Sequence, residues 1–182
     1  GKSKLYLQSE DNNLSSPKLE GWISTDAAKK ILALSGQDES LLQKALKKGF
    51  KPVALSTKAS IAFENEIKKS VSNNVAALLP GKERKDEVIV YSAHWDHLGI
   101  GEAIEGDSIY NGAVDNATGT AGLLEIAKAY VAAGQTKRSV LFLAVTAEEQ
   151  GLLGSEYYSK HPLFPAKKTV ANINMDALQP HG

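Results

Sequence analysis

The sequence has no cysteine among its 182 residues. Disulfide bonds and thiolate metal ligands are therefore excluded, and any metal site must be built from histidine and carboxylate side chains. An excess of charge is lacking too, because Lys+Arg and Asp+Glu each number 21. This balance gives no basic surface for nucleic acid. No apolar run approaches the ~18 residues that a membrane-spanning helix needs, so we expect no membrane partner.

Several motifs of other enzyme classes are also missing. The chain has no H-E-x-x-H, no G-x-S-x-G, no Walker loop and no G-x-G-x-x-G after a strand. What is present is ordinary for a soluble globular protein: 42% hydrophobic and 23% charged residues, enough for one sizeable domain. The chain begins at Gly1 without a start methionine or a signal peptide, so we expect its natural N-terminus to lie upstream.

The first 80 residues are predicted to form a tail, two short helices and a pair of strands. Residues 1–20 are polar and without periodicity, which indicates a tail or the remnant of a segment that has been removed. A helix is expected from the capping pair Ser24-Thr25 to the stop at Gly36, and a second over residues 40–48. Residues 58–69 and 74–79 are predicted to form an antiparallel pair of strands.

The pattern changes after residue 87. Residues 88–93, 139–146 and 169–175 are nearly continuous apolar runs, typical of strands buried on both faces of a sheet. Helices are expected between them, over residues 116–132 and 151–160. This alternation predicts an α/β fold with three layers, in which helices cover both faces of a mostly parallel mixed sheet.

Potential metal ligands follow each of these strands. They are His94 and Asp96, Glu148 and Glu149, and Asp176, with Asp115 added just before a helix. Ligands of open parallel sheets bind beyond the carboxyl ends of the strands, so these groups are expected to meet at one edge. Several acids gathered there repel one another unless a multivalent cation neutralises them. Imidazole with carboxylates favours zinc, and less specifically manganese or cobalt.

Each of these groups alone has a simpler explanation. A His-x-Asp sequence often occurs by chance, and an aspartate before a helix, such as Asp115, is usually an N-cap. The pair Glu148-Glu149 is typical of a solvated helix start, and Asp176 of a turn. Their joint placement at the same sheet edge is what favours a metal-hydrolase site.

The residues around these groups resemble a known family. The segments SAHWDHLG, NGAVDNATGTAGLLEIA, TAEEQGLLGS and NINMD, in this order, are similar to the di-zinc aminopeptidases of bacterial leucine-aminopeptidase type. Glutamate carboxypeptidase and glutaminyl cyclase are more distant relatives. The resemblance covers about residues 21–176, and it implies that residues 1–20 are a tail or the remnant of an inserted domain. It implies a zinc exopeptidase-like fold that is incomplete at its C-terminal end, with residues 21–182 forming a partial catalytic domain.

The resemblance also implies roles for individual residues. His94, Asp115 and Asp176 would hold one zinc ion, and Asp115 would bridge to a second ion held with Glu149. Glu148 would be the general base and acid.

Two supporting features are implied as well. Asp96 would accept the other ring N–H of His94 and so fix its tautomer. The peptide bond between Asp115 and Asn116 would be cis.

One part of the family pattern is missing. The second zinc ion of the family also needs a histidine well downstream of NINMD, but the chain ends at Gly182. His181 follows Asp176 too closely to be expected to serve. We therefore expect the chain to be part of a longer protein. His97 is interpreted as a supporting or surface histidine. Trp95 is interpreted first as a packing residue, with a place in the wall of the cleft as the alternative.

The function predicted on this basis is that of an aminopeptidase. A metal-bound water, with Glu148 as base, would hydrolyse the N-terminal bond of a peptide at a site of two Zn²⁺ ions. Two alternatives stay open: a carboxypeptidase or cyclase of the same fold, and a metal- or partner-binding fragment without turnover. We further expect secretion or a periplasmic location, by family resemblance alone, and possible self-association through an exposed sheet edge.

Overall fold

The computed structural model describes residues 4–17, 20–134 and 136–179. Two compact units are distinguished, Ser9–Lys69 and a larger unit made of Gly1–Gln8 with Ser70–Gly182. The predicted boundary between a tail and a catalytic domain at residue 20 stays a prediction. His181, considered above as a ligand, lies outside the described residues.

The smaller unit holds two helices. Helix α1 spans Thr25–Leu34 and begins as predicted, with the Ser24 hydroxyl accepting a hydrogen bond from the Ala27 N–H at 3.2 Å. Helix α2 spans Ser40–Ala45 and is shorter than predicted. The strand predicted over residues 58–69 is wrong, because no strand forms there and its apolar residues Ile61 and Phe63 are exposed.

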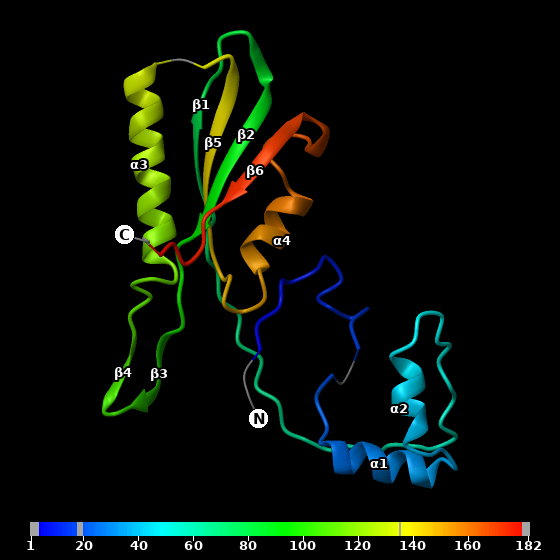
Figure 1. Ribbon diagram of the computed structural model, residues 1–182. Helices are drawn as coiled ribbons and strands as arrows, with labels where there is room; N and C mark the ends of the chain where they lie inside the picture. Colours follow the sequence, from blue (N-terminus) through cyan, green and yellow to red (C-terminus); the bar gives the residue numbers. More distant parts are fainter. Residues whose placement is uncertain (1–3, 18–19, 135, 180–182) are drawn as a thin grey trace. The chain divides into compact units, whose positions relative to one another are not determined.

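A four-stranded sheet forms the centre of the larger unit (Figure 1). Its strands are β1 (Val75–Leu79), β2 (Arg84–His94), β5 (Arg138–Val145) and β6 (Thr169–Asn174), in the order β1-β5-β2-β6. β2 runs parallel to both β5 and β6, whereas β1 is antiparallel to β5. The predicted mostly parallel mixed sheet is confirmed, but β1 pairs with β5 and not with the preceding segment.

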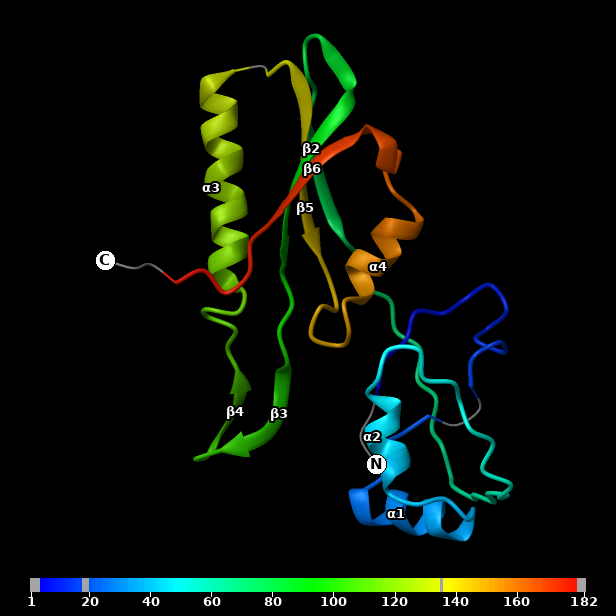
Figure 2. The same ribbon diagram turned by 45° about the vertical axis from the view of Figure 1, so that its right-hand side comes forward.

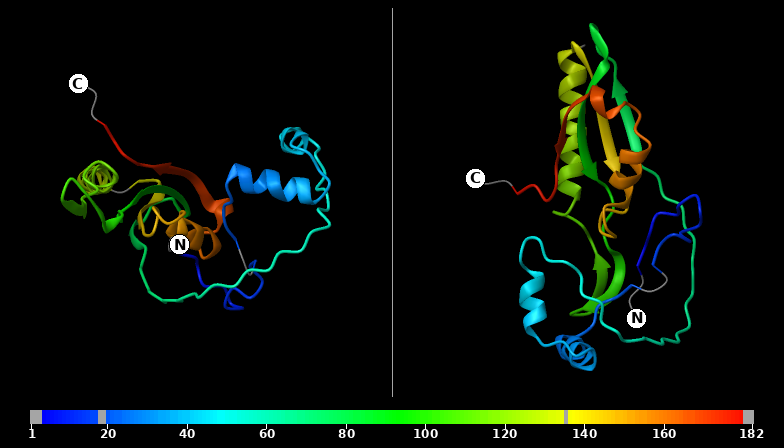
Figure 3. Two further views of the ribbon diagram at one scale, coloured as in Figure 1. Left: turned by 90° about the horizontal axis from the view of Figure 1, so that it is seen from below. Right: turned by 90° about the vertical axis from the view of Figure 1, so that its right-hand side faces the viewer.

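Helices cover both faces of this sheet. Helix α3 (Ala117–Ala133) and helix α4 (Leu153–Lys160) lie on opposite sides of the strands (Figure 3, right). One apolar cluster, including Val88, Val90 and Leu141, packs against Tyr158 of α4. The other face packs against α3 through a second cluster: Ala93, Leu123, Val140, Phe142 and Met175. This alternation of buried residues along β2 and β5 produces the predicted three layers.

Burial on both faces is confirmed only for the two inner strands. β5 buries most of its side chains, and β2 does so from Val88 onward, but β6 is exposed along most of its length. Val170 and Ile173 of β6 are 54% and 43% exposed. The prediction of a doubly buried third strand is therefore wrong for the described residues. An edge strand has a neighbour on one side only, so its apolar composition does not ensure its burial.

A two-stranded hairpin separates β2 from α3, where only a loop was expected. It consists of β3 (Gly99–Ile104) and β4 (Asp107–Tyr110), and β3 continues the chain beyond the end of β2 (Figure 2). Glu105 and Gly106 at its tip both have positive φ, 52° and 91°, as a tight type I′ hairpin turn requires. Among the described helices, none combines the length and apolarity needed to cross a membrane.

Adjacent leucines on α3 test the core packing. Leu123 is 5% exposed within the second cluster, and Leu124 is 61% exposed. We predict that Leu123→Ala lowers the free energy of unfolding by about 2–5 kcal/mol, because it leaves a cavity between helix and sheet. Leu124→Ala should change it by less than about 1 kcal/mol. Urea unfolding of both variants measures the difference, and equal losses would contradict the described face of α3.

Candidate metal centre

The pairing of the strands brings their carboxyl ends to one edge. His94, the last residue of β2, lies opposite Val145, the last residue of β5. The Trp95 N–H donates to the Val145 carbonyl at 3.0 Å, and the Met175 N–H donates to the Ser92 carbonyl at 2.8 Å. The residues that follow β2, β5 and β6 therefore start from the same level of the sheet, as the sequence predicted.

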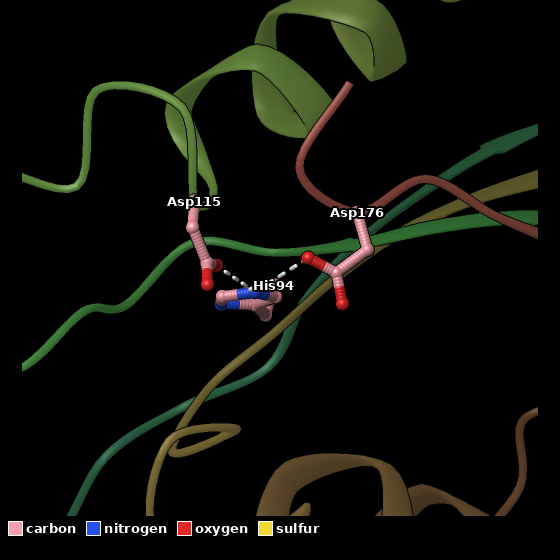
Figure 4. A group of neighbouring side chains, drawn as sticks. All are labelled: His94, Asp115 and Asp176. Atoms are coloured by element: carbon pink, nitrogen blue, oxygen red, sulfur yellow. Dashed lines mark hydrogen bonds and ion pairs between the residues drawn. The ribbon is translucent and has the colours of Figure 1, made fainter. Parts of the chain in front are cut away.

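His94 lies at the centre of this edge. Its side chain is 2% exposed, and Nε2 lies 3.0 Å from Oδ1 of Asp115 and 3.4 Å from Oδ1 of Asp176 (Figure 4). The two aspartates reach it from different segments, the loop before α3 and the segment after β6. A carboxylate oxygen of Glu148 is 3.9 Å from the same nitrogen. Residues distant in sequence thus converge on one ring nitrogen.

The other ring nitrogen determines what Nε2 can do. Nδ1 of His94 lies 3.0 Å from the main-chain carbonyl oxygen of Asp96. A carbonyl oxygen can only accept, so Nδ1 carries the hydrogen. A neutral ring then directs the lone pair of Nε2 at carboxylate oxygens, an arrangement that requires a cation between them. Either a second proton or a metal ion satisfies it, and a metal-bound histidine is typically held in this tautomer.

Asp115 supplies the test of whether a metal fits. Its Oδ1 is buried and accepts no hydrogen bond within the described part of the chain, although His94 Nε2 is only 3.0 Å away. Hydrogen-bond geometry at Nε2 is met with Asp176 and not with Asp115. Asp115 Oδ1 and His94 Nε2 thus lie close together without a hydrogen bond between them, as two ligands of the same metal ion do. The residues present therefore fit the zinc ion that the fold family implies.

A second group of potential ligands shares Asp115. His97, Asp115 and Glu149 each offer an atom, and these atoms lie within 4.8 Å of one another. His94, Asp115 and Asp176 form the first such group by the same measure. The predicted ligands His94, Asp115, Glu149 and Asp176 thus all belong to one of the two groups. His97, which was expected only to support the site or lie on the surface, belongs to the second.

Glu148 lies near the first group, with a carboxylate oxygen 3.9 Å from His94 Nε2. Burial raises the pKa of its carboxyl group, and the neighbouring carboxylates of Glu149, Asp176 and Asp115 raise it further, against an opposing effect of His94. For His94, burial lowers the ring pKa, but the Asp96 carbonyl and the Glu148 and Asp176 carboxylates outweigh burial, so the pKa is raised. Both shifts favour protonation in the metal-free protein, because protons are then the only positive charges available to this cluster.

The expected role of Asp96 needs a correction. Its carboxylate was predicted to accept the ring N–H of His94, but Oδ1 lies 3.8 Å from Nδ1, and the main-chain carbonyl accepts instead. The Asp96 carboxylate accepts a hydrogen bond from the Glu148 N–H at 3.1 Å. Asp96 therefore links the segment after β2 to the segment after β5, and holds the backbone of Glu148.

Sequence reasoning missed the side chain of Asn116. The predicted cis peptide bond between Asp115 and Asn116 is present. The Asn116 Nδ2 donates to the carbonyls of His94 and Met175 at 3.2 and 3.0 Å. Its Oδ1 accepts from the N–H groups of Gly119 and Ala177 at 3.0 and 3.2 Å. The spacing of Asn116 and Gly119 before an apolar helix is an N-cap signal that could have identified it.

A cleft of about 340 Å³ adjoins the second group. Trp95 is 48% exposed and lines this cleft, so the alternative to packing given for it above is the one observed. His97, Asn111, Thr120 and Leu124 contribute to its walls. The site thus opens to a partly apolar hollow between the segment after β2 and the start of α3.

Residues 74–182 match the family described as Peptidase family M28. The chain belongs to this family. The match covers β1 to β6 with both groups of potential ligands, so the resemblance deduced from the four motifs is confirmed. M28 membership agrees with hydrolase chemistry and a zinc cofactor for the residues described above.

Individual relatives of this M28 chain are aminopeptidases. It is 30% identical over 137 residues to mouse aminopeptidase NAALADL1, covering 70% of this chain and 17% of that protein. It is 33% identical over 117 residues to aminopeptidase YwaD of Bacillus subtilis, covering 63% and 23%. The chain also matches the crystal structure of BSAP, a zinc aminopeptidase from Bacillus subtilis, at 31% identity and a TM-score of 0.46. This match covers 57% of the present chain and 24% of the BSAP chain. The chain spans about a fifth of the length of its curated relatives.

Two glycines of α3 test the contact between this helix and the site. A Cβ at Gly119 would lie 2.2 Å from Asn116 Oδ1 and 2.6 Å from the Met175 carbonyl oxygen. A Cβ at Gly122 would meet only the flexible ends of Leu178 and Met175, at 3.3 Å. We predict that Gly119→Ala lowers the free energy of unfolding by about 1–3 kcal/mol and weakens zinc binding.

Gly122→Ala is the matched control. It should preserve zinc binding, and the helix propensity of alanine can even add about 0.5–1 kcal/mol of stability. Urea unfolding and zinc titration of both variants measure the effects. If Gly119→Ala binds zinc as tightly as the unsubstituted chain, the close packing at Asn116 does not support the site.

Proposed function

We propose that this chain carries the metal centre and the general base of a zinc-dependent aminopeptidase. The observation that carries the proposal is the ring of His94, whose Nδ1 hydrogen bond directs Nε2 at the carboxylates of Asp115 and Asp176. Membership of family M28 supports peptide hydrolysis. The names of NAALADL1 and YwaD favour an aminopeptidase over the carboxypeptidase and cyclase alternatives.

The complete site would hold two zinc ions with Asp115 shared between them. His94 and Asp176 complete the first ligand group, and Glu149 belongs to the second. When bound, zinc would polarise the scissile carbonyl and lower the pKa of water toward ~7. Asp115 suits a shared position because both groups contain it, and because its Oδ1 has no competing hydrogen bond among the described residues.

Glu148 is placed to move protons in this reaction. It accepts the proton of the attacking water and delivers it to the leaving amine at the new N-terminus. Two features suit it to this role: a carboxyl pKa that burial raises, and a backbone N–H fixed by the Asp96 carboxylate. The side chain stays 27% exposed, which leaves it accessible to a substrate.

Two further proposals concern the setting of the enzyme. We infer export from the cell, on family resemblance alone. We also infer that the chain self-associates through the free edge of β6, the last strand in the order β1-β5-β2-β6 of the described sheet.

Replacing the base separates chemistry from metal binding. We predict that Glu148→Gln in the complete enzyme keeps the zinc content but lowers kcat by about 10²–10⁴-fold, because the amide cannot accept the proton. Glu125→Gln is the control, since Glu125 forms an exposed ion pair with Lys128 on α3. Hydrolysis of aminoacyl anilides measures kcat. Undiminished turnover of Glu148→Gln would refute the assigned role.

Removing the central histidine tests the first ligand group. We predict that His94→Ala loses the most tightly bound zinc, because the aspartates alone do not form a zinc site of the usual histidine–carboxylate kind. His161→Ala is the control, as His161 is exposed at the end of α4. Mass spectrometry of metal content after dialysis measures the loss. Equal zinc in both variants would place the metal elsewhere.

A further inference from the structure

We propose that Asn74 is a positioning residue for the general base Glu148. Its side-chain amide joins the two ends of the Glu148 segment, residues 147–153, which connects β5 to α4. The inference rests on the proposed function, because it takes Glu148 as the group that moves the proton. It brings the start of β1 into a site otherwise built from the segments after β2, β5 and β6.

Asn74 directly precedes β1, the first strand in the order of the described sheet. Val75 lies opposite Ala144 of β5, so Asn74 is level with the end of β5. Its Oδ1 accepts a hydrogen bond from the Thr146 N–H at 3.0 Å, and its Nδ2 donates to the Gly154 carbonyl at 2.8 Å. One amide therefore connects the residue after β5 to the first turn of α4. In Figure 1 the chain enters β1 beside the turn that joins these two elements.

Gly154 makes this bridge possible because it has no side chain. A Cβ at this residue would lie 2.2 Å from the Thr146 carbonyl oxygen and 2.6 Å from Asn74 Oδ1. The Gly154 N–H donates to that carbonyl at 2.9 Å, and the Leu153 N–H donates to the Ala147 carbonyl at 3.1 Å. The Glu148 segment is thus closed at its base, and the Asn74 amide packs against the closure.

The Glu148 segment needs support from outside. Ala147 and Leu152 have positive φ, 52° and 62°, a region that is unfavourable for residues with a Cβ. Within the segment the Glu148 carbonyl accepts from two N–H groups further along, which shapes the turn but does not attach it to the sheet. Asp96 provides one outside hydrogen bond, to the Glu148 N–H, and Asn74 provides two more at the ends of the segment.

A residue that only attached β1 to the sheet would have other partners. β1 is already paired with β5 from Val75 to Leu79. The partners of the Asn74 amide lie beyond the last of these pairs, and both border the Glu148 segment. A general base must stay within hydrogen-bond reach of its proton, and a misplacement of ~1 Å can lower the rate by ~100-fold. Asn74 therefore acts on turnover through the position of Glu148.

A double-mutant cycle in the complete enzyme tests the proposal. At saturating zinc, we expect Asn74→Ala to lower kcat by about 10–100-fold and to change KM by less than ~3-fold, because proton transfer is impaired and substrate binding is not. In the Glu148→Gln background the same substitution should lower kcat by less than ~2-fold, since no base is left to position. Equal losses in both backgrounds would show that Asn74 acts independently of Glu148 and would overturn the proposal.

Asn73→Ala is the matched control. Asn73 is exposed, and it accepts a hydrogen bond from the Trp95 indole N–H at 3.2 Å through its main-chain carbonyl, which alanine retains. Its kcat should equal that of the unsubstituted enzyme. A loss as large as that of Asn74→Ala would contradict a specific role of the Asn74 amide.

Asn74→Asp keeps the size of the side chain, so it provides the test even where alanine disturbs folding. The carboxylate still accepts from the Thr146 N–H but cannot donate to the Gly154 carbonyl. We expect its kcat to lie between those of Asn74→Ala and the unsubstituted enzyme. Full turnover of Asn74→Asp would overturn the proposal.

Amide hydrogen exchange of the metal-free chain gives a readout that does not depend on activity. In Asn74→Ala and Asn74→Asp, the N–H groups of the Glu148 segment should exchange faster, by at least ~10-fold in the alanine variant, while those of β2 are unchanged. Unchanged exchange in the segment would show that the amide does not hold it, and the proposal would be wrong.

These outcomes separate the inference from the proposed function. A large loss of turnover in Glu148→Gln together with full turnover in Asn74→Ala would overturn the role of Asn74 and leave the base intact. Full turnover in Glu148→Gln would overturn the base, and the role of Asn74 with it.

Discussion

The side-chain amide of Asn116 holds the candidate metal centre together. It is 2% exposed and satisfies both donor hydrogens and both acceptor lone pairs through main-chain groups of three segments. Two of these segments carry His94 and Asp176, and Asp115 directly precedes Asn116. The backbones of the first ligand group are therefore tied to one another before any ion binds. A single buried amide accomplishes this because each unmade hydrogen bond would leave a polar group without water, at a cost of about 1–3 kcal/mol.

Fixing the backbones in this way forces like charges together. Carboxylates of Asp115, Glu148, Glu149 and Asp176 gather around two histidines at the edge of the sheet. The pKa of Glu148 is raised by burial first and then by the neighbouring carboxylates. The apolar layers on either side of β2 and β5 supply the stability that opposes this repulsion. The sheet thus holds the ligands in an arrangement that favours a cation, instead of relying on the cation to assemble them.

The sequence predicted the parts of this arrangement that depend on pattern. Continuous apolar runs predicted β2 and β5, and the residues placed just after each strand predicted the site, because strand ends meet at one edge of a parallel sheet. Details that depend on neighbours were not predictable. β6 has the composition of a buried strand but lies at the edge, and the Asp96 carbonyl replaces its carboxylate at His94. The hairpin of β3 and β4 was overlooked, although Glu105-Gly106 between alternating residues is a turn signal.

That hairpin is inserted between two ligands of a single centre, and its two ends touch. His97 and Gly112 pack directly against each other, so the chain is closed at its base before β3 begins and after β4 ends. A change in the length of the hairpin beyond this contact therefore need not change the positions of the ligands. Doubling such a loop costs only about 0.6 kcal/mol in closure entropy. Evolution or an engineer can therefore lengthen, shorten or replace the tip, and so reshape what approaches the cleft, without moving His94 or Asp115.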